Sequence, residues 1–300
     1  MKANAIIRII IWSIVLVLLL GILTVFLARE QYQIHYVTAT EVPTELVAAT
    51  PVQALPNEDK LVVDRNNVDK LEIEWVAGDI IIQPRDVEEI TISESDVRDE
   101  KYSMVWNMNE GTLELSFCEE YFMPGFVTDI SKDLYIDIPL DWNCRSLEID
   151  VAEATVEIRD MAIGDLDLDA ASGTIRVENC DIRTLDIDTA SGEVIFSGTL
   201  ETLDFDAASA NFTGEFYNTP ARIDMDSMSG MLDITLPEDC GYALSMGGLD
   251  KSFRSDFQGT ENRNGIHTYG DGHCRIKVDG MNCEVTIRKG ERSVHETEAP

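Results

Sequence analysis

Basic residues are scarce in this sequence, and the chain is strongly acidic as a result. It contains 23 Lys and Arg against 56 Asp and Glu, which gives a formal net charge of −33 at pH 7. Such a body repels nucleic acids and anionic lipid headgroups at long range. We therefore exclude nucleic-acid binding, and expect divalent cations or a partner with a basic surface as electrostatically compatible ligands.

The sequence also lacks the common motifs of metal sites and hydrolases. It has no C-x-x-C pair, no G-x-S-x-G nucleophile elbow, no EF-hand loop and no G-G-x-G-x-D-x-U-x calcium repeat. His267, Asp271, His273 and Cys274 lie close together in the sequence and could hold a metal, although loop residues of this kind usually do not. We therefore expect a protein that is not an enzyme, and no small-molecule substrate is indicated.

The six cysteines are scattered at spacings that match no known disulfide framework. An even number in an exported domain permits disulfides, and the sequence leaves their pairing open. We favour the alternative, that they are small buried apolar residues, because the repeats described below supply a core of their own. The cysteines are Cys118, Cys144, Cys180, Cys240, Cys274 and Cys283.

One hydrophobic run is long enough to cross a bilayer. Residues 9–28 contain only two polar residues, Ser13 and Thr24, and a helix of this length spans the roughly 30 Å hydrocarbon core. A cleaved signal peptide is the alternative. We favour an uncleaved transmembrane helix, because the apolar run is longer than the core of a signal peptide and Phe26 disfavours a small-residue cleavage site.

The flanking charges predict the orientation of this helix. Lys2 and Arg8 precede it, so the positive-inside rule places the N-terminus in the cytoplasm and the acidic body outside the cell membrane. The prolines that follow the helix favour an extended spacer. The predicted organisation is a cytoplasmic N-terminus at residues 1–8, a transmembrane helix at 9–28, a spacer at 29–57, an extracytoplasmic domain at 58–290 and a polar tail at 291–300.

A sequence motif of about 19 residues is repeated through the middle of the chain, from residue 147 to 237. Each copy alternates apolar and acidic residues, turns at a small-residue corner and continues as a second alternating strand. Such self-similarity is typical of stacked repeats. The copies begin at Leu147 (LEIDVAEATVEI), Leu166 (LDLDAASGTIRV), Leu185 (LDIDTASGEVIF), Leu203 (LDFDAASANFTG) and Ile223 (IDMDSMSGMLDI).

These repeats predict an all-β protein, a β-helix-like solenoid built as a single stack of sheet. Helices are disfavoured because Asp, Gly, Ser and β-branched residues dominate each copy. Outlying copies at residues 71–82 and 276–288 extend the array, and we expect the second to be the closing rung. The alternating stretches between residues 86 and 142 predict strands and hairpins that cap the first end. Residues 238–273 are rich in turn residues and predict a surface insertion or hairpin.

The small-residue corners make a further prediction about backbone conformation. Gly173, Gly192 and Gly230 occupy equivalent places after a serine, where a glycine can adopt positive φ. Ala210 stands in the fourth such place, so we expect that corner to differ.

Stacking would align equivalent aspartates into rows with about 4.8 Å between neighbours. Two like charges at that separation repel by about 1 kcal/mol in water. The repulsion could be offset by Asx-turn hydrogen bonds from local backbone N–H groups, or by a row of bound Ca²⁺. We favour the first, structural explanation, and expect no other cofactor. The candidate calcium ligands are Asp150, Asp169, Asp188, Asp206 and Asp226.

The tandem pattern L-x-I-D-x-A-S-G-x-V-x-I, with Ile138-Pro139 before the array and Leu236-Pro237 at its end, resembles a known bacterial family. This is a β-strand-repeat family of unknown function, provisionally labelled adhesin, found on the envelope of Gram-positive bacteria behind one transmembrane helix. The resemblance covers about residues 60–290. It implies a β-helix-like fold at the cell surface, sometimes near envelope-stress signalling systems, and it implies no catalytic residues.

Taken together, these features predict a non-enzymatic, membrane-anchored protein-interaction scaffold or accessory of envelope signalling. Its expected partner is an envelope or membrane protein of the same cell. The alternative is an adhesin that binds external ligands or matrix. An enzyme acting on wall glycans is a third hypothesis, because some glycosidases use paired carboxylates. Aligned aspartates create such pairs by chance, so their presence does not favour it.

Overall fold

The computed structural model describes residues 53–54, 60–95, 102–118 and 131–290. All of them belong to one compact unit, Thr50–Pro300. They form a fifteen-stranded sheet with no α-helix among these residues and one 3-10 turn, η1 (Arg65–Asn67). The prediction of an all-β, solenoid-like fold is therefore confirmed.

The predicted transmembrane helix at residues 9–28 and the tail at 291–300 lie outside the described residues. Within the described ranges, no helix is both long enough and apolar enough to cross a membrane. Gln53 and Ala54, which we placed in the spacer, form the short strand β1 and pair with β5 (Val105–Asn109).

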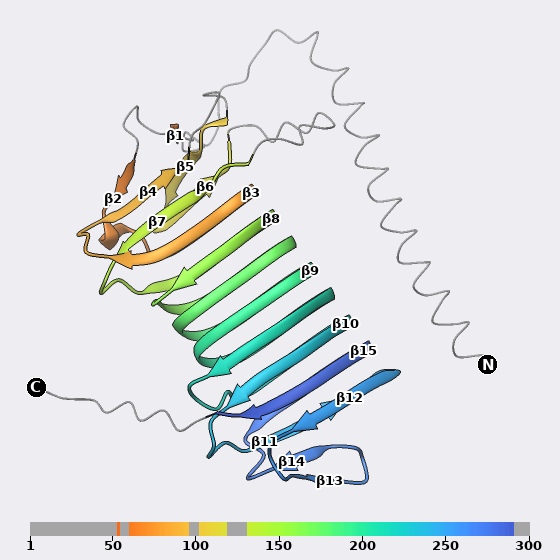
Figure 1. The fold of residues 1–300 in the computed structure, drawn as a ribbon. Coiled ribbons are helices and arrows are strands. Elements are labelled where there is room, and N and C mark those ends of the chain that lie inside the picture. The colour runs from red at the N-terminus through yellow and green to blue at the C-terminus, as the bar shows by residue number, and fades with distance from the viewer. Residues whose placement is uncertain (1–52, 55–59, 96–101, 119–130, 291–300) are drawn as a thin grey trace, which may run out of the picture. The chain divides into compact units, whose positions relative to one another are not determined.

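The centre of the unit is a stack of parallel strands that lie side by side (Figure 1). Each turn of the stack, which we call a rung, pairs with the next through equivalent residues of the repeat. Leu71 pairs with Leu147, and Leu147 pairs with Leu166. At the other end, Ile223 pairs with Leu203 and with Ile276. The sheet therefore pairs the residues that the repeat aligns. The strands are β3 (Lys70–Arg85), β8 (Cys144–Arg159), β9 (Ala162–Phe216), β10 (Arg222–Leu236) and β15 (Cys274–Lys289).

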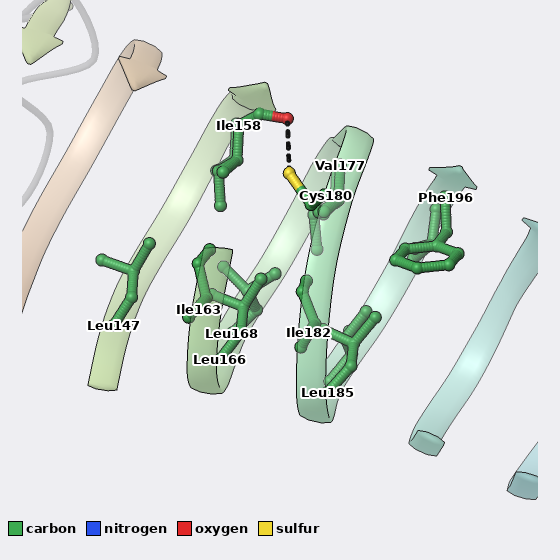
Figure 2. Packing of buried hydrophobic residues seen from close by; sticks show 14 of the residues in the cluster. Leu147, Ile158, Ile163, Leu166, Leu168, Val177, Cys180, Ile182, Leu185 and Phe196 are labelled. Carbon is green, nitrogen blue, oxygen red and sulfur yellow. Dashed lines mark hydrogen bonds between the residues drawn. The ribbon is translucent and has the colours of Figure 1, made fainter. Parts of the chain in front are cut away.

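Alternation along each strand builds a continuous apolar core. Leu166 and Leu168 are buried, whereas Asp167 and Asp169 between and beyond them are exposed, as expected when successive side chains point to opposite faces. Figure 2 shows the inward side chains of successive rungs packing against one another, with the thiol of Cys180 directed at the backbone oxygen of Ile158 at 3.8 Å.

The cysteines contribute to this core. No disulfide joins any of them in the described part of the chain, and burial raises the pKa of Cys144 to about 12 and that of Cys180 to about 11. Five of the six are buried, namely Cys144, Cys180, Cys240, Cys274 and Cys283.

The corner glycines are selected for two different reasons. Gly173 has φ of +140°, and a Cβ on it would lie 1.9 Å from the backbone oxygen of Ala154. Gly192 also has positive φ, at +147°. The prediction was wrong for Gly230, whose φ is not positive. There a Cβ would lie 2.4 Å from the backbone oxygen of Ala210, so lack of space selects glycine.

The N-terminal end of the stack is closed by a rung divided between two strands. β6 (Thr112–Ser116) pairs with the first half of β3 and β7 (Leu134–Pro139) with the second half, both in parallel. β5 and β4 (Ile90–Glu94) then add antiparallel to β6 and β7, and β2 (Leu61–Val63) adds to β4. β4, β5, β6 and β7 are the strands predicted between residues 86 and 142, whereas β2 was not predicted.

The C-terminal end is also closed by a divided rung, and this corrects the predicted order. β11 (Tyr242–Met246) and β12 (Asp250–Ser255) pair with the two halves of β15, so β15 lies between β10 and this last rung. The first part of the segment predicted as a surface insertion or hairpin, residues 242–255, therefore forms the final rung. Gly247 and Gly248 lie over Asp279 and Gly280, so this rung lacks the aspartate of the repeat. Asp250 and Lys251 stand at the place of the Ser-Gly corner. These departures hid the repeat.

Two short strands complete the C-terminal end. β14 (His267–Tyr269) pairs antiparallel with β11, and β13 (Thr260–Glu261) pairs with β14. Tyr242 is fully buried beneath them, with its ring 5.9 Å from those of Phe257 and Tyr269. This small aromatic cluster covers the end of the apolar core.

A buried lysine joins the N-terminal strands to the stack. Lys132 is 3 % exposed, and its ammonium group pairs with Glu94 and donates to the backbone oxygens of Tyr102 and Phe117 at 2.6 Å each. It lies 4.7 Å from the ring centre of Trp75 and 4.4 Å from that of Phe117. Burial lowers the pKa of Lys132, which its contact with Glu94 opposes.

We expect Lys132→Met to destabilise the protein by about 3 kcal/mol, because it leaves the Glu94 carboxylate buried without a cation. The measurement is denaturant unfolding of the full-length protein followed by tryptophan fluorescence. Arg254→Met is the matched control, because the pair of Arg254 with Glu284 is exposed and such pairs contribute little. Equal effects of the two substitutions would contradict the structural role of Lys132.

Candidate functional site

An open groove of about 1200 Å³ runs across the stack, perpendicular to the strands. Three neighbouring positions line it on six rungs, and two on the first rung. The first position is acidic, and we call these residues the acidic row: Glu74, Asp150, Asp169, Asp188, Asp206, Asp226 and Asp279. The third position is apolar, and we call these residues the apolar row: Ala152, Ala171, Ala190, Ala208, Met228 and Met281. Between them lies the floor, formed by Trp75, Val151, Ala170, Thr189, Ala207, Ser227 and Gly280.

The acidic row is aligned by the backbone pairing of the sheet. At one end Asp150 pairs in register with Glu74 and with Asp169. At the other end Asp226 pairs with Asp206 and with Asp279. The five aspartates proposed from the sequence as calcium ligands are all in this row, so the structure brings them to one surface.

A second line of carboxylates lies two residues earlier on each strand, outside the groove. We call it the outer row: Glu72, Glu148, Asp167, Asp186, Asp204 and Asp224. Since residues two apart on a strand share a face, the two rows form one lattice of carboxylates.

Cations balance this lattice only at its ends. At the first end the Lys70 ammonium group lies 2.6 Å from Glu72 and 2.7 Å from Glu148. At the other end Lys277 lies 2.8 Å from the carboxylate of Asp279, and Arg222 lies 3.3 Å from that of Asp204. Among the described residues, six central carboxylates have no ion-pair partner: Asp150, Asp167, Asp169, Asp186, Asp188 and Asp206.

The central carboxylates raise one another's pKa values. The pKa of Asp186 is raised to about 6 by partial burial, followed by the charges of Asp167, Asp204, Asp188 and Asp206.

The same two causes, with burial the larger, raise the pKa values of four further aspartates in the lattice. They are Asp150, Asp167, Asp204 and Asp206.

The local explanation that the sequence favoured for this repulsion is not supported. Within the described part of the chain, none of the five predicted aspartates accepts a hydrogen bond from a backbone N–H, so the expected Asx-turns do not form. Nor do three or more His, Cys, Asp or Glu side chains converge there as a metal site would require. Calcium binding at Asp150, Asp169, Asp188, Asp206 and Asp226 stays a prediction.

The floor contains one unsatisfied hydroxyl group. Ser227 is 5 % exposed, and its Oγ has no hydrogen-bond partner among the described residues. Thr189 occupies the equivalent place two rungs earlier, and its Oγ1 donates to the backbone oxygen of Ser191 at 3.2 Å. An unpaired buried hydroxyl is uncommon in folded proteins and calls for an explanation.

Within the described part of the chain, the residues near position 270 do not converge as metal ligands would. His267 packs on the rings of Phe253 and Tyr242, 4.8 and 5.9 Å between ring centres. Cys274 is fully buried, and the Asp271 carboxylate accepts the backbone N–H of His273 at 3.0 Å. These residues serve the aromatic cluster and a turn.

Sequence reasoning missed the groove and its apolar row. The signal was present, because the residue two places after each aspartate of the acidic row is apolar although it points outward. Met228 and Met281 are the clearest cases, at 59 % and 44 % exposure. A contiguous row of exposed apolar side chains can mark an interaction surface, whereas single ones are ordinary.

The family model of the Toastrack domain, DUF4097, matches residues 68–288. The chain belongs to the Toastrack family. This match confirms the resemblance inferred from the tandem sequence motif, and the matched residues include most of the described ones. No curated protein matches the sequence.

Several solved structures are similar to this Toastrack chain at low identity. A provisionally named cell adhesion protein from Clostridium sporogenes is 12 % identical, with 79 % of this chain and 100 % of that one covered and a TM-score of 0.35. A provisionally named adhesin from Bacteroides fragilis is 11 % identical, with 77 % and 96 % covered and a TM-score of 0.43. A provisionally named lipid binding protein from Parabacteroides distasonis is 13 % identical, with 77 % and 96 % covered and a TM-score of 0.34.

We expect Asp186→Asn to stabilise the protein at pH 7.5 but not at pH 4. The folded state raises the pKa of Asp186 from 3.8 to about 6, so it favours the protonated form. The contribution of the Asp186 carboxyl group to the free energy of unfolding is fully present below pH 4, and it is lost as the pH rises to about 6. The gain at pH 7.5 is about 1 kcal/mol after allowance for solvent screening, measured by denaturant unfolding at both pH values. Asp250→Asn, at an exposed position away from both rows, should show no such pH dependence.

We expect CaCl₂ and NaCl of equal ionic strength to raise the melting temperature of the full-length protein equally, because both screen the carboxylate lattice. A ligand that binds only the folded state adds stability of its own. A further rise with Ca²⁺ that EDTA reverses would contradict this expectation and identify the acidic row as a calcium site.

Proposed function

We propose that this Toastrack protein is a non-enzymatic interaction protein of the cell envelope, and that the groove is its binding face. The observation that supports this most directly is the central group of carboxylates, which the fold aligns and leaves without cations beside a row of exposed apolar residues. A carboxylate lattice of this kind costs stability in the free protein. A partner with a basic surface would relieve that cost on binding.

The chemistry of the groove supports binding rather than catalysis. Every rung presents the same arrangement, so no single rung is distinguished by a nucleophile, an acid–base pair or a converging set of donors. A catalytic site needs groups that differ in role and pKa. A repeated surface instead suits a ligand that is itself extended along the stack.

The predicted anchor supports a partner in the same envelope. With residues 9–28 as a single transmembrane helix and the N-terminus in the cytoplasm, the domain lies outside the cell membrane. The spacer reaches at most about 90 Å from the bilayer. This short reach favours a membrane or envelope protein of the same cell, in a scaffolding or signalling-accessory role, over a ligand on a distant surface.

The test is cross-linking on intact cells, followed by identification of what co-purifies with the full-length protein. We expect a stoichiometric envelope or membrane protein with the wild-type chain, and its loss with the triple substitution Asp169→Asn, Asp188→Asn and Asp206→Asn. The matched control removes three exposed carboxylates outside the groove, with Asp181→Asn, Glu193→Gln and Glu215→Gln.

Two outcomes would overturn the proposal. Recovery of partners only after foreign cells or matrix are added would indicate an adhesin. Cleavage of wall glycans by the wild-type protein, lost when one carboxylate pair is changed in a folded variant, would indicate an enzyme.

A further inference from the structure

We infer that the groove binds an extended polypeptide segment whose side chains are alternately basic and apolar, lying across the rungs. This inference rests on the proposed function and names the chemistry of the partner. It follows from the length of the groove, the spacing of its two rows, the charge on one row and the exposed apolar side chains on the other.

The length of the groove sets the length of the segment. Its acidic row has members on seven successive rungs, which at about 4.8 Å a rung extend over about 29 Å. An extended chain advances about 3.3 Å per residue. About nine residues of ligand therefore match the full groove.

The separation of the walls favours an extended chain over a helix. The acidic and apolar rows are two residues apart on each strand, as Asp169 and Ala171 are. Their Cα atoms are therefore separated by about 6.6 Å along the strand. An α-helix with its side chains is about 10–12 Å across. An extended chain can follow the line between the two rows with alternate side chains toward each, whereas a helix would cover both rows at once.

The two walls then impose the alternation. Successive side chains of an extended chain point to opposite sides, so every second residue faces the carboxylates and the others face the apolar row. Basic side chains on the first side would compensate the central aspartates, which have no cation of their own within the described residues. Apolar side chains on the second side would cover Met228 and Met281, which are now exposed.

The test is titration of the full-length protein with fluorescently labelled nonapeptides, read by anisotropy. The alternating peptide (Lys-Val)₄-Lys is compared with the block peptide Lys₅-Val₄, which has the same composition and charge. We expect the alternating peptide to bind at least about tenfold more tightly, because only it can face both walls at once. Equal affinities would overturn the inference and reduce the groove to a general attractor of cations.

Variants separate the contributions of the two walls. Asp169→Asn, Asp188→Asn and Asp206→Asn together should weaken the alternating peptide at least about tenfold, whereas Asp181→Asn, Glu193→Gln and Glu215→Gln should not. Met228→Ser with Met281→Ser should weaken the alternating peptide but leave nona-lysine unchanged. Retention of full affinity in the groove variants would contradict the assigned position.

The two proposals fail in different ways. If the cellular partner is lost in the triple aspartate variant but the alternating peptide has no advantage, the groove binds its partner by another chemistry and only this inference is wrong. If the alternating peptide binds as expected while the cellular partner is retained in that variant, the proposed function of the groove is wrong.

Discussion

Parallel, in-register hydrogen bonding between rungs is the constraint on which the rest of this structure depends. A parallel ladder satisfies every backbone group only if each rung repeats the path of its neighbour. The path includes corners where the chain passes so close to the rung below that a Cβ on Gly173 would lie 1.9 Å from a backbone oxygen. Spacing in the sequence, corner composition and burial all follow from this one requirement.

The same constraint has opposite energetic effects on the two faces of the sheet. Inside, alignment of apolar residues is favourable, because stacking such as Leu147 over Leu166 excludes water from a continuous core. Outside, it places carboxylate over carboxylate, which is unfavourable. The chain offsets that repulsion at the ends of the stack with Lys70, Arg222 and Lys277, and leaves the centre acidic. Persistence of an unfavourable arrangement beside exposed apolar residues is more readily explained by binding than by folding.

The repeat predicted the central part of the fold, because residues such as Leu166 and Asp169 recur at a spacing that only stacked strands explain. It did not predict the two ends, where each last rung is divided, and where Asp250-Lys251 replaces the Ser-Gly corner of the final rung. It also did not predict the burial of Lys132 against Trp75 and Phe117, since contacts between distant segments leave no periodic trace. For the candidate site, the acidic row was visible as a column of aspartates. Its neighbouring apolar row was overlooked, because only Met228 and Met281 stand out and alanine beside aspartate resembles any exposed strand.

Hydrogen exchange of the full-length protein, with and without its co-purified partner, tests the central claim most directly. Four segments on successive rungs carry the acidic row and the apolar row: residues 148–152, 167–171, 186–190 and 204–208. The account predicts slower exchange in all four segments when the partner is bound, and no change at residues 178–183 on another side of the stack. Slower exchange at residues 178–183 alone would place the binding face elsewhere and contradict the account.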